Sequence, residues 1–193
     1  MSPFISIVIP FYGTADPVLL QRCLDSIRQQ GMEEGSYEII VADDNGKGLG
    51  GARNQGIRQA TGTYLMFVDA DDYLFPNLSY CFSYLLKYTP DICSFQMCEV
   101  NRAGVIPRSF NYKWEVYESG AEYMSKNNFM GTAWRHFFSR SFLNIHGLAF
   151  AESCFHEDED FVAKAYCLAL TTLITDYPVY AYFRSSSSII HER

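Results

Sequence analysis

Three carboxylates follow an apolar run in the first half of the chain. Residues 64–68 are all apolar or aromatic, and Asp69, Asp71 and Asp72 come soon after them. A continuous apolar run of this length is typical of a strand that is buried on both faces of a parallel sheet. The carboxylates would then lie at the carboxyl end of a central strand, where open α/β sheets bind their ligands.

Acids this close together repel one another, and a cation lying between them would remove the repulsion. Mg²⁺ and Mn²⁺ prefer oxygen ligands and often share them with the phosphates of a substrate. A Mg²⁺ or Mn²⁺ site between Asp69 and Asp72 is therefore one interpretation of the segment. The other is a solvated acidic turn, which Pro76 favours. These residues alone do not separate the two.

Two further acidic clusters occur in the chain. Asp43 and Asp44 follow a second apolar run, residues 37–42, in the same way. If the two strands are neighbours, their acids lie side by side. The third cluster, residues 155–161, precedes a helical pattern over residues 162–170. Because the dipole of a helix favours negative charge in its first turn, helix capping is an alternative role for this cluster.

A glycine-rich segment, residues 46–51, separates Asp44 from Arg53. Glycines let a backbone approach a ligand closely, and Arg53 would lie near the first turn of a helix over residues 52–60. The alternative is a flexible loop with a solvated arginine, because a glycine-rich loop alone is weak evidence for a binding site.

The first hundred residues alternate strands with helices over short connections, which predicts a doubly wound, mostly parallel α/β sheet. The expected strands are residues 4–10, 37–42, 64–68 and 91–98, and the expected helices begin after Asp16 and cover residues 52–60 and 76–87. Residues 101–104 predict a turn. The second half is less regular, with helices expected after Ser119 and over 162–170 and two short strands at 173–175 and 179–183.

The composition excludes several classes of protein. The chain has 193 residues, 48% of them hydrophobic and 16% aromatic, which suits one substantial domain. A formal net charge of −7 and an isoelectric point of about 5.0 argue against a nucleic-acid binder. No apolar run approaches the roughly 20 residues that cross a bilayer, and residues 1–4 do not begin a signal peptide. The six scattered cysteines are expected to be buried free thiols rather than a zinc site.

Taken together, five segments resemble the family 2 glycosyltransferases, which have the GT-A fold. The resemblance rests on residues 6–12, 40–46, 52–57, 69–72 and 157–158, in this order. It implies one Rossmann-like GT-A domain over residues 1–193. Residues 1–100 would form the half that binds a nucleotide sugar, and residues 101–193 the irregular half on the acceptor side. A C-terminally trimmed chain is left open.

The same resemblance assigns roles to particular residues. Asp71 would be the ligand of Mg²⁺ or Mn²⁺, and Asp158 would be the catalytic base. Asp72 would orient neighbouring groups or the donor sugar, with Glu157 also beside that sugar. The residues expected at the donor nucleotide are Pro10, Phe11, Tyr12, Asp43, Asp44, Arg53, Asp69 and Ala70.

Other residues keep two interpretations each. His136 and His156 are rival candidates for the base, and Arg135 and Arg184 either hold phosphates or are solvated or ion-paired. Four aromatic residues either stack on sugar rings or belong to the core: Trp114, Tyr117, Trp134 and Phe137.

The activity that the resemblance implies is inverting transfer of one sugar from a nucleotide-diphosphate donor, a UDP-sugar, to a hydroxyl group. The acceptor would be a glycan or a lipid-linked molecule in cell-surface polysaccharide synthesis. We expect a cytoplasmic, non-processive hexosyltransferase and leave peripheral contact with the inner face of the membrane open. Single transfer is expected because Trp134-Arg135 reverses the order found in processive synthases and no membrane helix is evident.

The main alternative is a catalytically silent module that binds a nucleotide sugar. A nucleotidylyltransferase should open with a glycine-rich loop containing arginine, which residues 10–13 do not provide. A phosphatase with an aspartyl nucleophile and a receiver domain both need an acid pair after the first strand, which is absent here.

Overall fold

The computed structural model describes residues 2–11, 16–76, 78–106, 109–110, 113–128 and 130–184 of the chain. The strands are β1 (Ile5–Phe11), β2 (Tyr37–Asp43), β3 (Tyr64–Phe67), β4 (Tyr73–Leu74), β5 (Ile92–Asn101), β6 (Gly104–Val105), β7 (Trp114–Tyr117), β8 (His136–Ser139) and β9 (Thr172–Phe183). The helices are α1 (Pro17–Arg28), α2 (Gly48–Gln59), α3 (Leu78–Tyr88), α4 (Gly120–Lys126), α5 (Arg140–Ile145) and α6 (Glu157–Leu168), with the 3₁₀ turn η1 (Ala133–Arg135) before β8.

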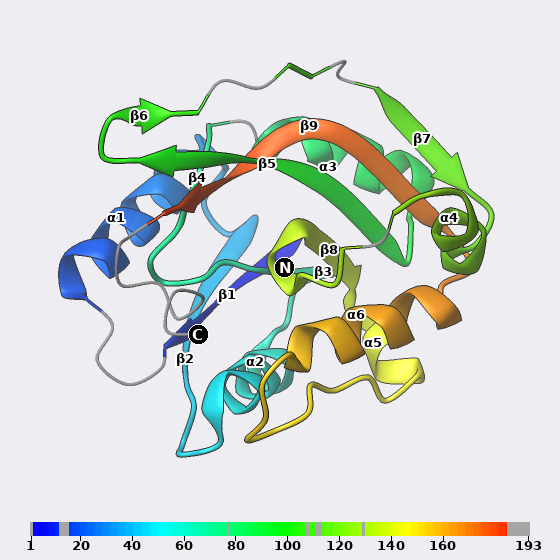
Figure 1. The fold of residues 1–193 in the computed structure, drawn as a ribbon, viewed down its shortest axis with the longest axis horizontal. Helices are drawn as coiled ribbons and strands as arrows, with labels where there is room; N and C mark the ends of the chain where they lie inside the picture. Colours follow the sequence, from blue (N-terminus) through cyan, green and yellow to red (C-terminus); the bar gives the residue numbers. More distant parts are fainter. Residues whose placement is uncertain are drawn as a thin grey trace.

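These described strands form one nine-stranded sheet in the order β2-β1-β3-β8-β5-β9-β4, with β6 beside β5 and β7 beside β9 (Figure 1). Pairs β1–β2, β1–β3 and β5–β9 are parallel, whereas β8 is antiparallel to both β3 and β5. Five strands of this path therefore run in one direction, and β8 and β4 run in the other. The mostly parallel α/β sheet expected from the sequence is confirmed.

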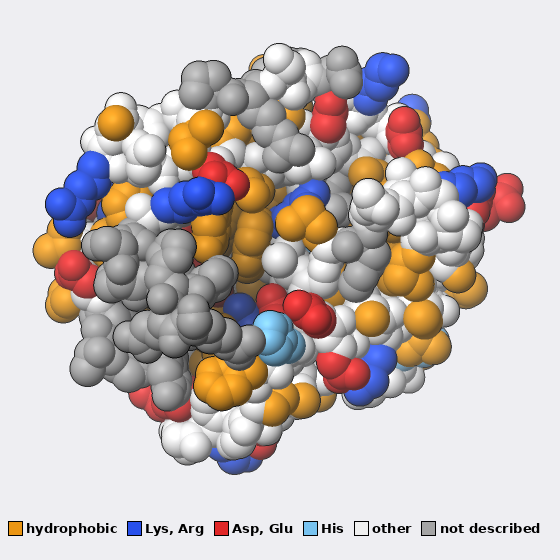
Figure 2. Space-filling model, in the orientation of Figure 1, with side chains coloured by type: hydrophobic (Ala, Val, Ile, Leu, Met, Phe, Trp, Pro, Cys, Tyr) orange, Lys and Arg blue, Asp and Glu red, His pale blue; other side chains and the backbone are white. Residues whose placement is uncertain are grey.

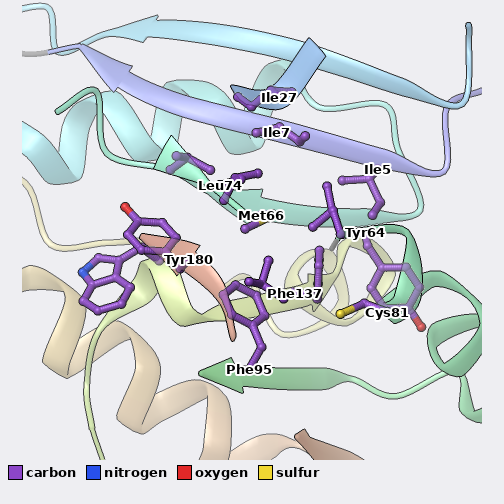
Figure 3. Packing of buried hydrophobic residues seen from close by; sticks show 14 of the residues in the cluster. Ile5, Ile7, Ile27, Tyr64, Met66, Leu74, Cys81, Phe95, Phe137 and Tyr180 are labelled. Atoms are coloured by element: carbon purple, nitrogen blue, oxygen red, sulfur yellow. The ribbon is translucent and has the colours of Figure 1, made fainter. Parts of the chain in front are cut away.

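The sheet is covered by helices on both faces because its central strands are apolar on both sides. In β1, Ile5, Ile7 and Ile9 belong to one buried cluster, which includes residues of α1 and α3. Figure 3 shows Ile5 and Ile7 packed with Met66 of β3 in that cluster. Val8 points to the other face and joins a second cluster, which includes residues of α5 and α6. This two-sided burial explains the continuous apolar runs that predicted the strands.

Local capping signals place two helices where the sequence predicts them. The Asp16 carboxylate accepts a hydrogen bond from Val18 N–H, 2.8 Å, at the start of α1. The Ser119 hydroxyl accepts one from Glu122 N–H, 3.0 Å, at the start of α4. Both follow the N-cap pattern in which a side-chain oxygen satisfies an unpaired backbone N–H. The acids of the third cluster do occupy the first turn of α6.

Several predicted elements were wrong in extent or missing. Helix α2 begins at Gly48 rather than at residue 52, so most of the expected glycine-rich loop is helical. The two short strands expected near the end are one strand, β9, with a register shift opposite Pro178. The sequence pattern did not predict β4, β7, β8 or α5. Strands β2 and β3 are not neighbours, since β1 lies between them.

Two expectations from composition can be compared with the described residues. All six cysteines are free thiols as expected, but only four are buried, and Cys154 and Cys167 are exposed. Among the described helices, none combines the length and the apolar character that crossing a bilayer requires.

Candidate functional site: a carboxylate cluster at the sheet edge

The carboxyl ends of β1, β2 and β3 meet at one edge of the sheet. In the parallel register Phe11 pairs with Asp43, and Val8 pairs with Phe67. Asp69 therefore follows β3 beside the last residues of β1, of which Pro10 is buried. Strand ends of this kind are where open α/β sheets hold ligands. Tyr12, which was expected beside the nucleotide, lies outside the described residues.

The two acids after β2 face different partners. The Asp43 carboxylate accepts a hydrogen bond from Asn45 N–H at 2.7 Å and remains exposed. One oxygen of Asp44 accepts a hydrogen bond from Gly48 N–H at 3.1 Å, where α2 begins. Asp44 therefore binds the first residue of α2, which favours a helix that begins inside the glycine-rich segment.

Arg53 joins the first and third acidic clusters. Its Nη2 lies 3.2 Å from Oδ1 of Asp69, and its Nη1 lies 2.6 Å from Oε1 of Glu157. The residue is 1% exposed, and its Nε has no hydrogen-bond partner among the residues that the structure describes. Burial alone lowers the pKa of Arg53, but Asp69, Asp158 and Glu157 outweigh it and the net shift is upward. A buried guanidinium is stable only when paired in this way.

Asp158 lies half-buried in the first turn of α6, next to Glu157. Its pKa is raised, first by burial and then by the charges of Glu157 and Asp69, while Arg53 opposes the shift. Within the described part of the chain no side chain or backbone group of another residue hydrogen-bonds to its carboxylate. A partly desolvated, unengaged carboxylate has the properties of a general base.

The loop after β3 is anchored by β9. The buried Asp72 carboxylate accepts hydrogen bonds from the Tyr180 hydroxyl, 2.7 Å, and from Phe183 N–H, 2.7 Å. The Tyr180 hydroxyl in turn accepts one from Asp69 N–H at 3.0 Å. Burial and the charge of Asp69 raise the pKa of Asp72 well above its usual value. Tyr180 could not be recognised from the sequence, because nothing separates it from the other aromatic residues of an apolar strand.

Asp71 differs from Asp72 in being exposed. The Arg22 guanidinium donates to the backbone oxygen of Asp71, 2.6 Å, and thereby holds the turn. The Asp71 carboxylate accepts no hydrogen bond from another described residue, and the pKa of Asp71 is raised by partial burial and by the charge of Asp69. No group of three or more His, Cys, Asp or Glu side chains arranged for a metal occurs among the described residues. Asp71 and Asp69 still fit Mg²⁺ or Mn²⁺, since such ions are commonly held by one or two carboxylates plus substrate phosphates.

Close contacts hold the segment before α6 against α2. A Cβ at Gly50 would overlap the carbonyl oxygen of Ala151, so only glycine fits there. Asn54 donates to Phe150 O, 2.9 Å, and accepts from Phe150 N–H, 2.8 Å. These contacts bring Glu157 and Asp158 to Arg53. Asn54 had no expected role of its own, although it lies in one of the motifs that carry the family resemblance.

The rival candidates lie elsewhere or are otherwise engaged. His136 is buried; its Nδ1 lies 2.9 Å from Thr132 O and its Nε2 lies 3.1 Å from the Tyr166 hydroxyl. Burial, with help from Arg135, lowers the pKa of His136 to about 3. His156 is exposed and lies 3.3 Å from Glu159.

The arginines and aromatic residues left open by the sequence are also placed. Arg184 forms an exposed ion pair with Glu99, 2.8 Å. Arg135 is buried in η1. Trp134 and Phe137 are buried in the core cluster shown in Figure 3, which makes core the better interpretation for both. Trp114 stacks on Tyr84 with ring centroids 3.9 Å apart.

Figure 2 shows acidic, basic and histidine side chains gathered at the margin of a hollow in the middle of the face that is seen. The fold and the site together define an α/β protein with carboxylates from the end of β3 and from α6 gathered around one buried arginine. The model of the family described as Glycosyl transferase family 2 matches residues 6–47 and 45–144. The chain belongs to this family.

Individual relatives agree with the family. The chain is 28% identical over 227 residues to EpsJ of Bacillus subtilis, described as an uncharacterized glycosyltransferase, covering 98% of the chain and 63% of EpsJ. It is 37% identical over 97 residues to a poly(ribitol-phosphate) beta-glucosyltransferase of Bacillus spizizenii, covering 36% of the chain and 15% of that protein. The chain thus spans less than two thirds of the length of these relatives.

Solved structures show the same fold. The chain is similar to Staphylococcus aureus TarS 1-349 in complex with UDP-GlcNAc, with a TM-score of 0.80 and 19% identity, covering 100% of the chain and 61% of that structure. The likeness to TarS 1-349 without this ligand gives a TM-score of 0.79 at 21% identity, covering 95% and 60%. The sheet and its helices therefore form the GT-A fold.

Proposed function

We propose that the chain is the catalytic part of an inverting, metal-dependent glycosyltransferase. It transfers one sugar from a UDP-sugar to a hydroxyl group of a glycan or lipid-linked acceptor in cell-surface polysaccharide synthesis, at the cytoplasmic side of the membrane. The observation that carries the proposal is Arg53, whose ion pairs with Asp69 and Glu157 bring the acids of β3 and α6 together. Family membership supports it.

The donor nucleotide lies, in this proposal, along the carboxyl ends of β1 and β2. Asp43 is exposed there and adjoins Phe11 in the parallel register. Pro10 and Asp44 flank this pair, and Asp69 with Ala70 borders it on the side of β3. The solved complexes of TarS with UDP and with UDP-GlcNAc support a UDP-sugar for this chain.

The roles of three residues become more specific than the sequence suggested. Arg53 is too deeply buried to face the nucleotide with an open side chain, so we assign it to holding Asp69 and Glu157 in place. Glu157 is itself buried against Arg53, which favours support over direct contact with the sugar. Asp72 has both oxygens engaged, so it orients the loop that carries Asp71.

Asp71, with the free oxygen of Asp69, would hold Mg²⁺ or Mn²⁺. The ion would stabilise the negative charge that develops on the departing diphosphate. Arg22 holds the backbone of Asp71 so that its exposed carboxylate stays at the end of β3.

Asp158 accepts the proton of the acceptor hydroxyl. The hydroxyl oxygen forms a bond to the anomeric carbon on the face opposite the diphosphate, and the bond between that carbon and the phosphate oxygen breaks, which inverts the configuration. A base of raised pKa near the operating pH accepts the proton effectively. Asp158, whose pKa is raised and whose carboxylate accepts no hydrogen bond from another described residue, suits this role better than His136, whose pKa is about 3 and whose nitrogens already have partners.

The test is release of UDP from candidate UDP-sugars, measured with Mn²⁺ and an acceptor for the wild type and for Asp158→Asn. We expect the variant to lose at least about a hundredfold in kcat, a typical contribution of a general base, while its affinity for UDP is kept. Full transfer by Asp158→Asn would refute the assignment of the base. A wild type that binds UDP but releases none with any donor would support the silent binding module instead.

A further inference from the structure

A pocket that shares no residue with the site described above is lined by β5, β8 and α6. It has a volume of about 190 Å³. The described residues that line it come from β5, α4, η1, β8 and α6 and from the segment after α4: Ser94, Gln96, Met97, Tyr123, Asn128, Met130, Arg135, His136 and Tyr166.

The charge of this pocket comes from Arg135. That residue is 7% exposed, donates from Nε to Phe95 O at 3.1 Å, and has Nη1 2.8 Å from Sδ of Met130. No aspartate or glutamate is among the described residues that line the pocket. His136 is neutral at physiological pH because burial and Arg135 lower its pKa to about 3.

The polar groups of the pocket suit an oxyanion. Gln96 and Asn128 carry amide N–H donors, whereas the Ser94 side chain is hydrogen-bonded to Tyr166. Asn128 and Met130 are exposed and form the mouth, whereas Ser94 and Arg135 are buried at the floor. A guanidinium in a partly desolvated pocket forms its strongest hydrogen bonds with phosphate or carboxylate oxygens.

The pocket is also close to the proposed reaction centre. Gly131, next to Met130, packs so tightly against the first turn of α6 that a Cβ there would lie 2.7 Å from Cα of Glu159. Trp134, next to Arg135, stacks on Tyr180 with ring centroids 4.6 Å apart. The segments that line the pocket therefore contact both the turn that carries Asp158 and the strand that anchors Asp72.

We propose that this Arg135 pocket binds an oxyanion carried by the acceptor, a phosphate or a carboxylate group, and thereby selects acidic acceptors. The identity of the ligand as an acceptor rests on the proposed function. Binding of the oxyanion does not, so it can be tested without any transfer reaction.

The experiment titrates ¹⁵N-labelled protein, free of divalent metal, with inorganic phosphate in one arm and acetate in the other. The side-chain amide signal of Gln96 reports on the pocket. We expect saturable shifts, and the arm that saturates identifies the group. Asn128→Asp adds a carboxylate at the exposed mouth and should weaken binding about tenfold or more by like-charge repulsion. Arg135→Gln should abolish binding, and if it does not fold, Asn128→Asp decides.

The matched control is Asn144→Asp, which makes the same chemical change at an exposed position of α5 outside the pocket. It should bind like the wild type, which separates a local effect from the change in net charge. No saturable shift of Gln96 with either anion, or equal affinity in Asn128→Asp and the wild type, would overturn the proposal. If UDP release nevertheless proceeds, only the pocket is refuted and the proposed function stands.

Discussion

At the scale of single residues, the site depends on the buried charge of Arg53. From the sequence, this arginine was expected at the donor nucleotide or, alternatively, solvated beside a flexible loop. The structure buries it between Asp69 and Glu157, which lie 16 and 104 residues away in the chain, and so excludes the solvated alternative. A buried cation needs such partners, because an unpaired one would cost several kcal/mol, about 3–5 in known cases. The same charges also shift the pKa of Asp158.

The first prediction concerns Glu157→Gln and the pH dependence of transfer. The charge of Glu157 raises the pKa of Asp158. Removing that charge lowers this pKa and leaves Arg53 less neutralised, which lowers it further. Because a base acts above its pKa, the acid limb of the pH profile of kcat should move to lower pH. The profile of UDP release measures it.

Glu159→Gln is the control for this prediction. Glu159 lies in the same turn of α6 but is exposed, so solvent screens its charge more than that of the buried Glu157. Its acid limb should match that of the wild type. An acid limb of Glu157→Gln that stays in place, or moves to higher pH, would contradict the electrostatic role of Glu157.

At the scale of elements, β9 connects the C-terminal half to the proposed metal-binding turn. The sequence around Pro178 suggested two short strands, since proline cannot donate to a sheet ladder. The structure keeps one strand by shifting the register of β5 opposite that proline. As a result the Tyr180 hydroxyl and Phe183 N–H reach the carboxylate of Asp72.

The second prediction is the effect of Tyr180→Phe on stability. The substitution removes the hydroxyl that donates to Asp72 and accepts from Asp69 N–H, and leaves both groups short of a partner in a buried site. The free energy of unfolding should fall by about 1–3 kcal/mol, the usual cost of an unsatisfied buried polar group. Chemical denaturation measures this quantity.

Tyr80→Phe provides the comparison, because the same hydroxyl is removed from a residue that is 61% exposed. Its effect should stay within about 0.5 kcal/mol, as for most surface substitutions. Equal stabilities of Tyr180→Phe and Tyr80→Phe would show that the link between β9 and the turn contributes nothing.

At the scale of the whole molecule, the fold gathers negative charge at one place. The chain carries a net charge of −7, and three acidic clusters lie around the carboxyl edge of the sheet. The negative charges of Asp69 and Asp71 repel each other, which is one reason why the pKa of Asp71 is raised. Carboxylates repel one another when no cation lies between them. Binding of a divalent ion and a nucleotide would therefore increase the stability of the folded protein.

The third prediction follows from this linkage. Adding Mn²⁺ together with UDP should raise the Tm of the wild type, by an amount that corresponds to about 2.7 kcal/mol at a hundredfold excess over Kd. Removing the metal with EDTA should reverse the rise. Asp71→Asn should lose the metal-dependent part, yet be at least as stable as the wild type without metal, since one repulsive charge is gone. Thermal denaturation of the wild type and of Asp71→Asn, with Mn²⁺ and UDP, after EDTA and without ligands, measures these changes.

Glu34→Gln removes an exposed carboxylate from the turn before β2 and is the control for net charge. It should keep the full response to Mn²⁺ and UDP. A metal-dependent rise in Tm that survives in Asp71→Asn would exclude Asp71 as a necessary ligand.

Local patterns predicted much of the fold. The apolar runs of β1, β2 and β3 and the caps at Asp16 and Ser119 are set by interactions between residues close in sequence, so they can be read without coordinates. The elements that were missed, such as β8, are short and have no periodicity of their own. Their conformation is set by partners in the sheet rather than by propensity.

The family, the α/β class and the residue types available for chemistry could be predicted from the chain alone, because motifs and hydrophobic periodicity are local properties of the sequence. Which acids are free and which are already paired is a property of the folded molecule. Asp71 and Asp158 carry open carboxylates, whereas Asp72 and Glu157 are bound to Tyr180 and Arg53. The physical reason is that burial and pairing depend on contacts between distant segments, and no spacing within the chain encodes them.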